Sequence, residues 1–429
     1  MTHFNWILAA CLAVPGAMAA PLDFDTYLSA VERNSLELQA QQESIASAKA
    51  GIGIAGLRPD PQFSLGAGRE AVRSLPHHPV TWTPALSMTI ETGGKRDARI
   101  KAAHSNVALA EETVAGFKSA LYASSAAAFT EACRTRDVAA RKEQTLAALS
   151  KVVTANEVRR KAGDVGGIEL LQSRVERDQF QAELLQARSD AQGAQLALSP
   201  LLGRPLDEVF PQAQLACDVA SFDGGATGAL LAQALDARSD VRIARAALDN
   251  QRDGAALVRA NRSVDPTVTL GLSAVRGYHD GVDGAGAPVD GAARSRAVTL
   301  TLAVPIALSR RDHGDVVQAE AGVTQAMLAL RQAELQAQIQ VHAAQLQLRA
   351  AQDKLARYRD GVLVDAQKVV DGLRLSYFSG NASLLEWLAA QRSADDAWQG
   401  YLQARADAAN ASAQLQLAIG RRPVLQGKE

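Results

Sequence analysis

The sequence repeats itself at long range, and this repeat limits the folds that the chain can adopt. The segment LLQARSDAQ begins at Leu184, and YLQARADAA begins 217 positions later at Tyr401. The same offset aligns Gly163 with Gly380. An ungapped match of about forty residues indicates an internal duplication. The chain is therefore expected to contain two versions of one structural unit.

Each version contains an unusually long helical segment. Residues 95–162 hold no proline and keep a helical spacing of apolar side chains, and residues from about 310 to 378 do the same. A straight helix over the first range would be about 100 Å long. Ordinary globular helices are far shorter, so these segments are expected to pack as coiled coils along much of their length.

Four short segments show the alternation that is typical of strands. In one of them Phe63 and Leu65 alternate with Ser64 and Gly66, which predicts one apolar face and one small or polar face. The four strands are expected at about 61–69, 84–92, 266–275 and 296–305. Each repeat then reads as helix, strand, strand, long helix and return helix.

The repeats and their flanks divide the whole chain. The expected parts are a signal peptide (1–19), a first repeat (20–205), a connector (206–228), a second repeat (229–422) and a C-terminal tail (423–429). The first helix of each repeat is expected at about 22–56 and 229–262.

The first nineteen residues have the features of an export signal. An apolar run from Ile7 to Val14 is followed by Pro15-Gly16 and by a small-x-small cleavage site. A buried amino-terminal helix and lipidation at Cys11 are the alternatives. Beyond this segment no stretch approaches eighteen uninterrupted apolar residues, which argues against a transmembrane helix. Cys133 and Cys217 could pair after export or remain inert buried thiols.

The composition argues against several classes of function. A net charge of −1 gives no reason to expect nucleic acid as a partner. No nucleophile–base pair, phosphate-binding loop or dinucleotide fingerprint is present. The histidines at His77, His78 and His279 do not have the spacing of a zinc site. The chain is therefore expected to be no enzyme and to bind neither a cofactor nor a resident metal.

The strands also predict an oligomer in a membrane. Strands of about nine residues are long enough to cross an outer membrane, but four strands cannot close, and an open edge in lipid leaves backbone groups unsatisfied. Three copies would supply twelve. The expected fold is mainly α-helical with a β membrane part, a trimeric 12-stranded β-barrel continued by an α-helical periplasmic barrel. The alternatives are a soluble four-stranded sandwich and a periplasmic coiled-coil scaffold without a pore.

This plan resembles the TolC-type outer-membrane efflux channels over nearly the whole mature chain. Two turn motifs carry the resemblance, GDVGGIELL after Ala162 and GNASLLEWL after Ser379. The segment ETGGKRDARI, which begins at Glu91, is similar to the E-x-GGKR junction of the cobalt–zinc–cadmium (heavy-metal) branch.

The resemblance implies a function and partners. The chain would be a homotrimeric exit duct in the outer membrane that extends into the periplasm and contacts outer-membrane lipid. It would work with a periplasmic adaptor protein and an inner-membrane transporter of the resistance-nodulation-division type, and would export heavy-metal cations. Drug efflux and type I protein secretion remain alternatives within the same fold.

The resemblance also implies a gate at the periplasmic tips, formed by Glu386, Glu169 and Tyr377. With three-fold symmetry Glu386 would form an acidic ring that favours cations. The alternative is a surface acid in the first turn of a helix, where the helix dipole favours it. Tyr377 is expected to hydrogen-bond to Glu169 and hold the aperture shut, and a packed aromatic side chain is the alternative.

Two further groups of residues follow from the resemblance. The hairpin tips would dock the adaptor through Gly163, Asp164, Leu171, Gly380, Asn381 and Leu388. The junctions between strands and helices would consist of Glu91, Gly93, Gly94, Lys95, Arg96, Arg310 and Arg311. The basic residues of this second group are expected to anchor at the inner headgroup boundary rather than to touch cargo.

Overall fold

The computed structural model describes residues 21–69, 80–212, 214–217, 222, 225–276, 281–282, 285–289, 294–306 and 313–425. The expected signal peptide, the lipidation site at Cys11, the junction residues Arg310 and Arg311, and the loop histidines lie outside these residues. Within the described part of the chain, no helix is both long enough and apolar enough to span a membrane.

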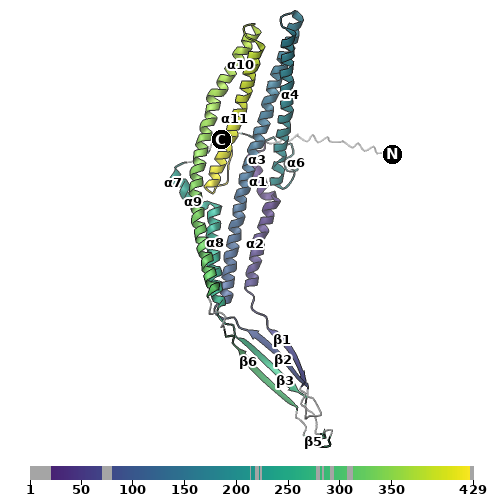
Figure 1. Ribbon diagram of the computed structural model, residues 1–429, viewed down its shortest axis with the longest axis vertical. Helices are drawn as coiled ribbons and strands as arrows, with labels where there is room; N and C mark the ends of the chain where they lie inside the picture. Colours follow the sequence, from purple (N-terminus) through teal and green to yellow (C-terminus); the bar gives the residue numbers. More distant parts are fainter. Residues whose placement is uncertain are drawn as a thin grey trace, which may run out of the picture. The chain divides into compact units, whose positions relative to one another are not determined.

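The chain forms two compact units, and neither unit corresponds to one sequence repeat (Figure 1). The first unit comprises Met1–Ala40, Phe117–Arg238 and Ala337–Glu429, and the second comprises Gln41–Gly116 and Ser239–Gln336. Each unit therefore combines segments from both repeats.

The helices follow the expected order in both halves. The first half holds α1 (Phe24–Asn34), α2 (Leu36–Ala55), α3 (Lys95–Ala162), α4 (Gly167–Leu196), α5 (Leu198–Leu202) and α6 (Leu206–Val209). The second half holds α7 (Thr227–Ala237), α8 (Ser239–Asn261), α9 (Gly314–Arg357), α10 (Leu363–Phe378) and α11 (Leu384–Ala418).

The first helix of each repeat is broken, contrary to the prediction of continuous helices at 22–56 and 229–262. The breaks fall at Ser35, after α1, and at Arg238, after α7. A distant glycine touches the chain at each break. A Cβ added to Gly203 would lie 2.6 Å from the carbonyl oxygen of Asn34, and one on Gly420 would lie 2.6 Å from the carbonyl carbon of Ala237.

These glycines explain a repeated motif. Gly203 and Gly420 are the third residues of LLGR and AIGR, which are 217 positions apart. Only glycine permits so close an approach of two backbones. The motif is therefore duplicated because the same break has to be packed in both repeats.

The second long helix is interrupted as well, where a continuous helix from about 310 to 378 was predicted. A π-helical turn, Tyr358–Val362, separates α9 from α10. The ring of Tyr358 lies directly against Gly400 of α11, where an added Cβ would be 2.7 Å from the tyrosine hydroxyl. The π-helical turn thus coincides with a close contact between an aromatic ring and the neighbouring helix.

The strands form one antiparallel sheet in the second unit. Its order is β1 (Gln62–Arg69), β2 (Val80–Thr89), β3 (Thr267–Val275) and β6 (Ser295–Ala303). Strand β2 begins and ends earlier than the predicted range of 84–92. A small pair of strands that was not predicted, β4 (Gly281–Val282) and β5 (Pro288–Val289), lies between β3 and β6 in sequence.

The two faces of the sheet differ as the alternation predicts. One row of apolar side chains crosses all four strands, because each residue is the register partner of the next: Phe63, Leu86, Leu270 and Leu300. All four side chains are exposed. The opposite face carries small polar side chains such as Thr89 and Thr267, whose hydroxyls lie 3.2 Å apart. Among the described strands, β1 and β6 are each paired on one side only.

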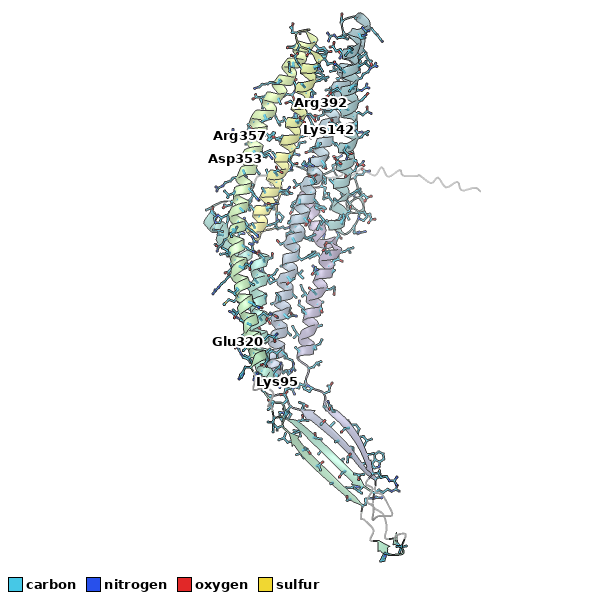
Figure 2. All side chains as sticks on the ribbon, in the orientation of Figure 1. Lys95, Lys142, Glu320, Asp353, Arg357 and Arg392 are labelled. Atoms are coloured by element: carbon cyan, nitrogen blue, oxygen red, sulfur yellow. A yellow bond between two sulfur atoms is a disulfide. The ribbon has the colours of Figure 1, made fainter. Side chains whose placement is uncertain are left out.

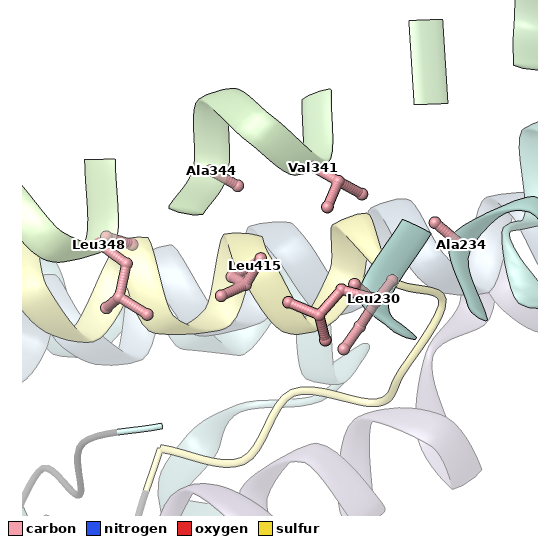
Figure 3. Close-up of a cluster of buried hydrophobic side chains, with 8 residues drawn as sticks. Leu230, Ala234, Val341, Ala344, Leu348 and Leu415 are labelled. Atoms are coloured by element: carbon pink, nitrogen blue, oxygen red, sulfur yellow. The ribbon is translucent and has the colours of Figure 1, made fainter. Parts of the chain in front are cut away.

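The helical core of the first unit is packed mainly through small and branched side chains. Figure 3 shows one cluster in which Leu230 and Ala234 of α7 face Val341, Ala344 and Leu348 of α9 and Leu415 of α11. Alanine at these positions lets the helices approach closely. The cluster joins α7 to α9, whose packed residues are more than one hundred positions apart in the sequence.

The two cysteines that the sequence left unassigned form a disulfide. Cys133 of α3 is bonded to Cys217 of the connector, with a sequence separation of 84. The same connector pairs with the start of the described chain, because the amide of Leu22 donates to the carbonyl of Gln214 over 2.7 Å.

Candidate functional site

The hairpin tips of the first unit are built on two equivalent glycine turns. Gly163 follows α3 with a φ of +88°, and Gly380 follows α10 with a φ of +77°. The amide of the next residue, Asp164 or Asn381, donates to a helix carbonyl five residues earlier over 2.9 and 2.8 Å. This pattern closes a helix through a left-handed residue, which glycine adopts without strain. All four residues are exposed.

The helices that return from the tips begin differently. Ser383 precedes α11, and its hydroxyl accepts a hydrogen bond from the amide of Glu386 over 3.2 Å. The Glu386 carboxylate accepts from the Ser383 amide in turn over 2.8 Å, which completes a capping box. Gly166 occupies the equivalent position before α4 and offers no side chain.

Glu386 is exposed, and its charge is stabilised by this cap. Hydrogen bonds from the backbone and the side chain of Ser383 hold the pKa of Glu386 below its usual value. The carboxylate is therefore ionised at neutral pH. The acidic ring predicted for this residue stays a prediction.

Tyr377 is buried near the end of α10 and forms the contact that the sequence resemblance led us to expect. Its hydroxyl lies 2.8 Å from Oε1 of Glu169 and 2.8 Å from Oδ1 of Asn156. The hydroxyl has one proton and donates it to one of these acceptors at a time. Burial, reinforced by the hydrogen bond to Glu169, raises the pKa of Tyr377 to about 12.

Two residues of this cluster were not expected from the sequence. Asn156 and Arg159 both lie on α3, and the Arg159 guanidinium sits 5.3 Å from the centre of the Tyr377 ring. Their spacing of three residues places them on one face of the helix. That spacing is the signal in the sequence that could have identified them.

A compact apolar cluster supports Tyr377. It consists of Leu149, Val152, Phe180, Tyr377, Leu384, Trp387 and Leu388. The Trp387 ring is stacked on the Tyr377 ring, with centroids 6.4 Å apart. Tyr377 is therefore held in one orientation by packing as well as by hydrogen bonds.

The burial of Leu388 in this cluster contradicts its predicted role in docking the adaptor. Leu388 is only 6% exposed because it packs in the cluster, so it has little surface to offer an adaptor. Its repeat equivalent, Leu171, is 59% exposed. The docking role of Leu171 and of the four exposed turn residues stays a prediction.

The strand–helix junction of the second unit is a hydrogen-bonded network. Arg99 forms a two-point ion pair with Glu91, one arm of which measures 3.0 Å. Asp265, which precedes β3, accepts from the amide of Thr92 over 2.9 Å and pairs with Lys95. The carboxylates of Glu91 and Asp265 thus fix the start of α3 against the ends of β2 and β3.

The glycine and basic residues of the motif belong to the same network. A Cβ on Gly93 would lie 2.1 Å from the hydroxyl of Ser263, so this position requires glycine. Lys95, labelled in Figure 2, is 7% exposed and ion-paired. The prediction that Lys95 anchors at lipid headgroups is therefore wrong. Arg96 donates to the carbonyl of Gly56 over 2.8 Å, and its headgroup role stays a prediction.

Sequence reasoning missed Arg99 and Asp265 as members of this junction. Arg99 lies within the quoted segment ETGGKRDARI, eight residues after its partner Glu91. Asp265 is in the other repeat, so a pattern within one repeat does not identify it. Among the described residues, no group of three or more His, Cys, Asp and Glu side chains is arranged to hold a metal ion.

The sequence profile described as "Outer membrane efflux protein" matches residues 27–204 and 230–421. The cobalt-zinc-cadmium resistance protein CzcC of Cupriavidus metallidurans is 24% identical over 417 residues, which are 95% of this chain and 92% of that protein.

Solved structures share the fold. A structure of CusC superimposes with a TM-score of 0.75 at 19% identity, covering 93% of this chain and 92% of that one. The outer membrane protein VceC of Vibrio cholerae gives a TM-score of 0.71 at 20% identity, covering 93% and 96%. The predicted fold class is confirmed by these likenesses.

Proposed function

The chain belongs to the outer membrane efflux protein family and is an outer-membrane exit channel of a tripartite pump; we propose that its cargo is heavy-metal cations. The observation that carries this proposal is the similarity to the cobalt-zinc-cadmium resistance protein along both chains. The junction built by Glu91, Gly93 and Lys95 supports it, because these residues form the E-x-GGKR motif by which the chain resembles the heavy-metal branch.

We propose that the channel is a homotrimer whose sheets join edge to edge. Strands β1 and β6 are paired on one side only among the described strands. The exposed row of Phe63, Leu86, Leu270 and Leu300 is suited to contact with lipid. An unpaired strand edge in lipid is costly, and three copies would pair every edge while leaving an aqueous lumen.

The adaptor is proposed to dock at the hairpin tips, and the transporter to be of the resistance-nodulation-division type. Exposure of Gly163, Asp164, Leu171, Gly380 and Asn381 supports the docking surface. No covalent chemistry is assigned to this chain, since a duct needs only to let its cargo pass.

The gate is proposed to combine a latch and an acidic ring. The hydrogen bond from Tyr377 to Glu169 supports the latch, because it links α10 to α4 at the tip. The exposed, ionised carboxylate of Glu386 supports the ring. Three such carboxylates around one axis would lower the energy of a cation in the aperture.

Growth of a deletion strain tests the cargo. We expect loss of tolerance to cobalt, zinc and cadmium, and recovery when the gene is returned. Unchanged metal tolerance together with loss of drug tolerance would show that the cargo proposal is wrong and the drug-efflux alternative is right.

Conductance of the purified protein in a planar bilayer tests the pore and the ring. The Glu386→Gln variant is expected to shift the reversal potential in a salt gradient toward lower cation preference. Glu37→Gln, an exposed acid on α2, serves as the matched control. Absence of channels would refute the pore, and equal reversal potentials for the two variants would refute the ring.

A further inference from the structure

A cavity that the channel function does not explain lies in the first unit. Its volume is about 410 Å³, and it is lined by side chains of α3, α10 and α11. Tyr377 does not line this cavity. Trp387 does line it, and its ring is also stacked on the Tyr377 ring. The cavity is large enough for a small organic molecule.

Two of the residues that line the cavity each hold a buried N–H donor that lacks an acceptor. Nε1 of Trp387, a residue only 2% exposed, has no hydrogen-bond partner among the described residues. Nε of Arg141 is also buried and has no hydrogen-bond partner among the described residues. Buried donors are nearly always satisfied in folded proteins. These two residues thus carry donor capacity that the described protein leaves unused.

The charge of the lining points to an anion. Arg141, Lys151 and Arg374 line the cavity, and within the described chain none of them lies within ion-pair distance of a carboxylate. The Arg141 guanidinium rests 4.7 Å from the centre of the Trp398 ring. Burial lowers the pKa of Arg141, and the charge of Asp395 partly opposes this effect. An anion beside Arg141 would offset the cost of burying its charge.

The nearby acids are already engaged. Asp371 lines the cavity, and both its oxygens accept from Nε2 of Gln367 over 3.1 Å. Asp395 pairs with Lys142 over 3.3 Å and accepts from Gln399 over 2.9 Å. Three cations against one lining acid leave the cavity with a net positive charge.

The remaining lining is apolar and selects for an organic body. Val152, Val370, Phe378 and Ala148 contribute side chains without donors or acceptors. An inorganic anion would leave these surfaces in contact with water. A molecule that has one charged end and one hydrocarbon end satisfies both kinds of lining.

We propose that this cavity is a binding site for an organic carboxylate with an apolar body. The carboxylate pairs with Arg141 and the cations Lys151 and Arg374, while the hydrocarbon part packs against Val152, Val370 and Phe378. The proposal does not depend on the metal cargo, because its ligand has the opposite charge.

Isothermal titration calorimetry of the full chain in non-ionic detergent tests this site. Phenylacetate is the probe, phenylethanol is the matched ligand without charge, and sulfate is the matched ligand without an apolar body. We expect phenylacetate to bind at least tenfold more tightly than either. No measurable binding of phenylacetate, or equal binding of phenylethanol, would overturn the proposal.

Variants then locate the binding. Lys151→Gln combined with Arg374→Gln changes two exposed side chains, so folding is not at risk, and is expected to weaken phenylacetate binding by about tenfold. Lys161→Gln, an exposed lysine on α3 outside the cavity, is the control and should bind as the parent does. Equal affinities for both variants would overturn the assignment.

Tryptophan emission gives a second readout. With Trp82→Phe as background, the emission of the described chain comes from Trp387, which lines the cavity, and from Trp398, which lies against Arg141. Phenylacetate is expected to change this emission with the affinity measured by calorimetry. Binding heat without any change in emission would place the ligand elsewhere and refute the site.

Discussion

The tip between α3 and α4 and the tip between α10 and α11 each place a glutamate at the third residue of the returning helix. Glu169 and Glu386 are 217 positions apart and therefore equivalent in the repeat. Glu386 is bound by Ser383 of its own turn, whereas Glu169 accepts from Tyr377 of another helix. A glutamate at the same repeat position therefore caps its own helix in one tip and binds a distant helix in the other.

The residue before each helix accounts for the difference. Ser383 binds the first turn of α11 and draws Glu386 into a reciprocal cap. Gly166 has no hydroxyl, so the Glu169 carboxylate remains available to a more distant donor. Tyr377 itself has Arg160 as its repeat equivalent, so only the second tip supplies a phenol. The duplicated tips have therefore diverged at two positions that act together.

The largest effect is expected from the two equivalent leucines. Leu388→Ala removes a buried side chain from the tip cluster and should destabilise the second tip by about 2–5 kcal/mol. Leu171→Ala, at an exposed position, should change stability by no more than about 0.5 kcal/mol. Hydrogen exchange of the tip amides measures both. Similar exchange rates in the two variants would contradict the asymmetry of the tips.

The next effect concerns the tyrosine that only one tip has. Tyr377→Phe keeps the ring and its packing but leaves Asn156 and Glu169 without their donor, at a cost of about 1–3 kcal/mol. Faster exchange of tip amides and a larger open-channel current are expected. Tyr401→Phe, on α11, is the control. Equal behaviour of the two variants would show that the hydroxyl does not hold the tip.

The same hydrogen bond predicts a dependence on pH. The pKa of Tyr377 is raised from the ordinary value of 10.0 to about 12, so the folded tip favours the protonated phenol. Its contribution to stability is complete below pH 10 and is lost as the pH rises through 12. Tyrosinate absorbance of the parent minus that of Tyr377→Phe measures the transition. A difference midpoint near pH 10 would contradict the buried, hydrogen-bonded phenol.

The smallest effect comes from converting one tip into the other. Gly166→Ser is compatible with the backbone, because the φ of −73° and the ψ of 156° suit any residue. The new hydroxyl should stabilise the first turn of α4 by a few tenths of a kcal/mol. It should also draw Glu169 away from Tyr377 and speed exchange beside the tyrosine.

Ser383→Gly is the reciprocal control for this exchange of roles. It should weaken the first turn of α11 and leave the hydrogen bond of Tyr377 intact. If Gly166→Ser slows exchange in α4 without any change near Tyr377, the competition for Glu169 does not occur.

Much of the fold could be predicted because its signals are local. The alternation of apolar and small residues predicted strands, and the proline-free run from Lys95 predicted a helix without interruption. The breaks at Ser35 and Arg238 could not be predicted from neighbouring residues, since neither is a glycine or a proline. Their cause is contact with Gly203 and Gly420, far along the chain.

The site was predictable to a smaller extent. The pair of Tyr377 and Glu169 followed from a family resemblance, and the Ser-x-x-Glu signature of a capping box can be read at 383–386 but not at 166–169. The burial of Leu388 could not be read, because its repeat equivalent is exposed and the difference arises from packing against Trp387. The cavity beside Arg141 depends on three helices at once and has no signature in one segment.

The disulfide between Cys133 and Cys217 makes complete folding depend on an oxidising compartment. It ties the connector to α3, and the connector in turn pairs with the first described residues of the chain through Leu22. Closing a loop of 84 residues lowers the entropy of the unfolded chain and stabilises the folded state by about 4.5 kcal/mol on an entropic account. Thiols in a reducing cytosol do not pair. The disulfide therefore forms only after the chain has crossed the inner membrane, and the connector is bonded to α3 only in the compartment beyond it.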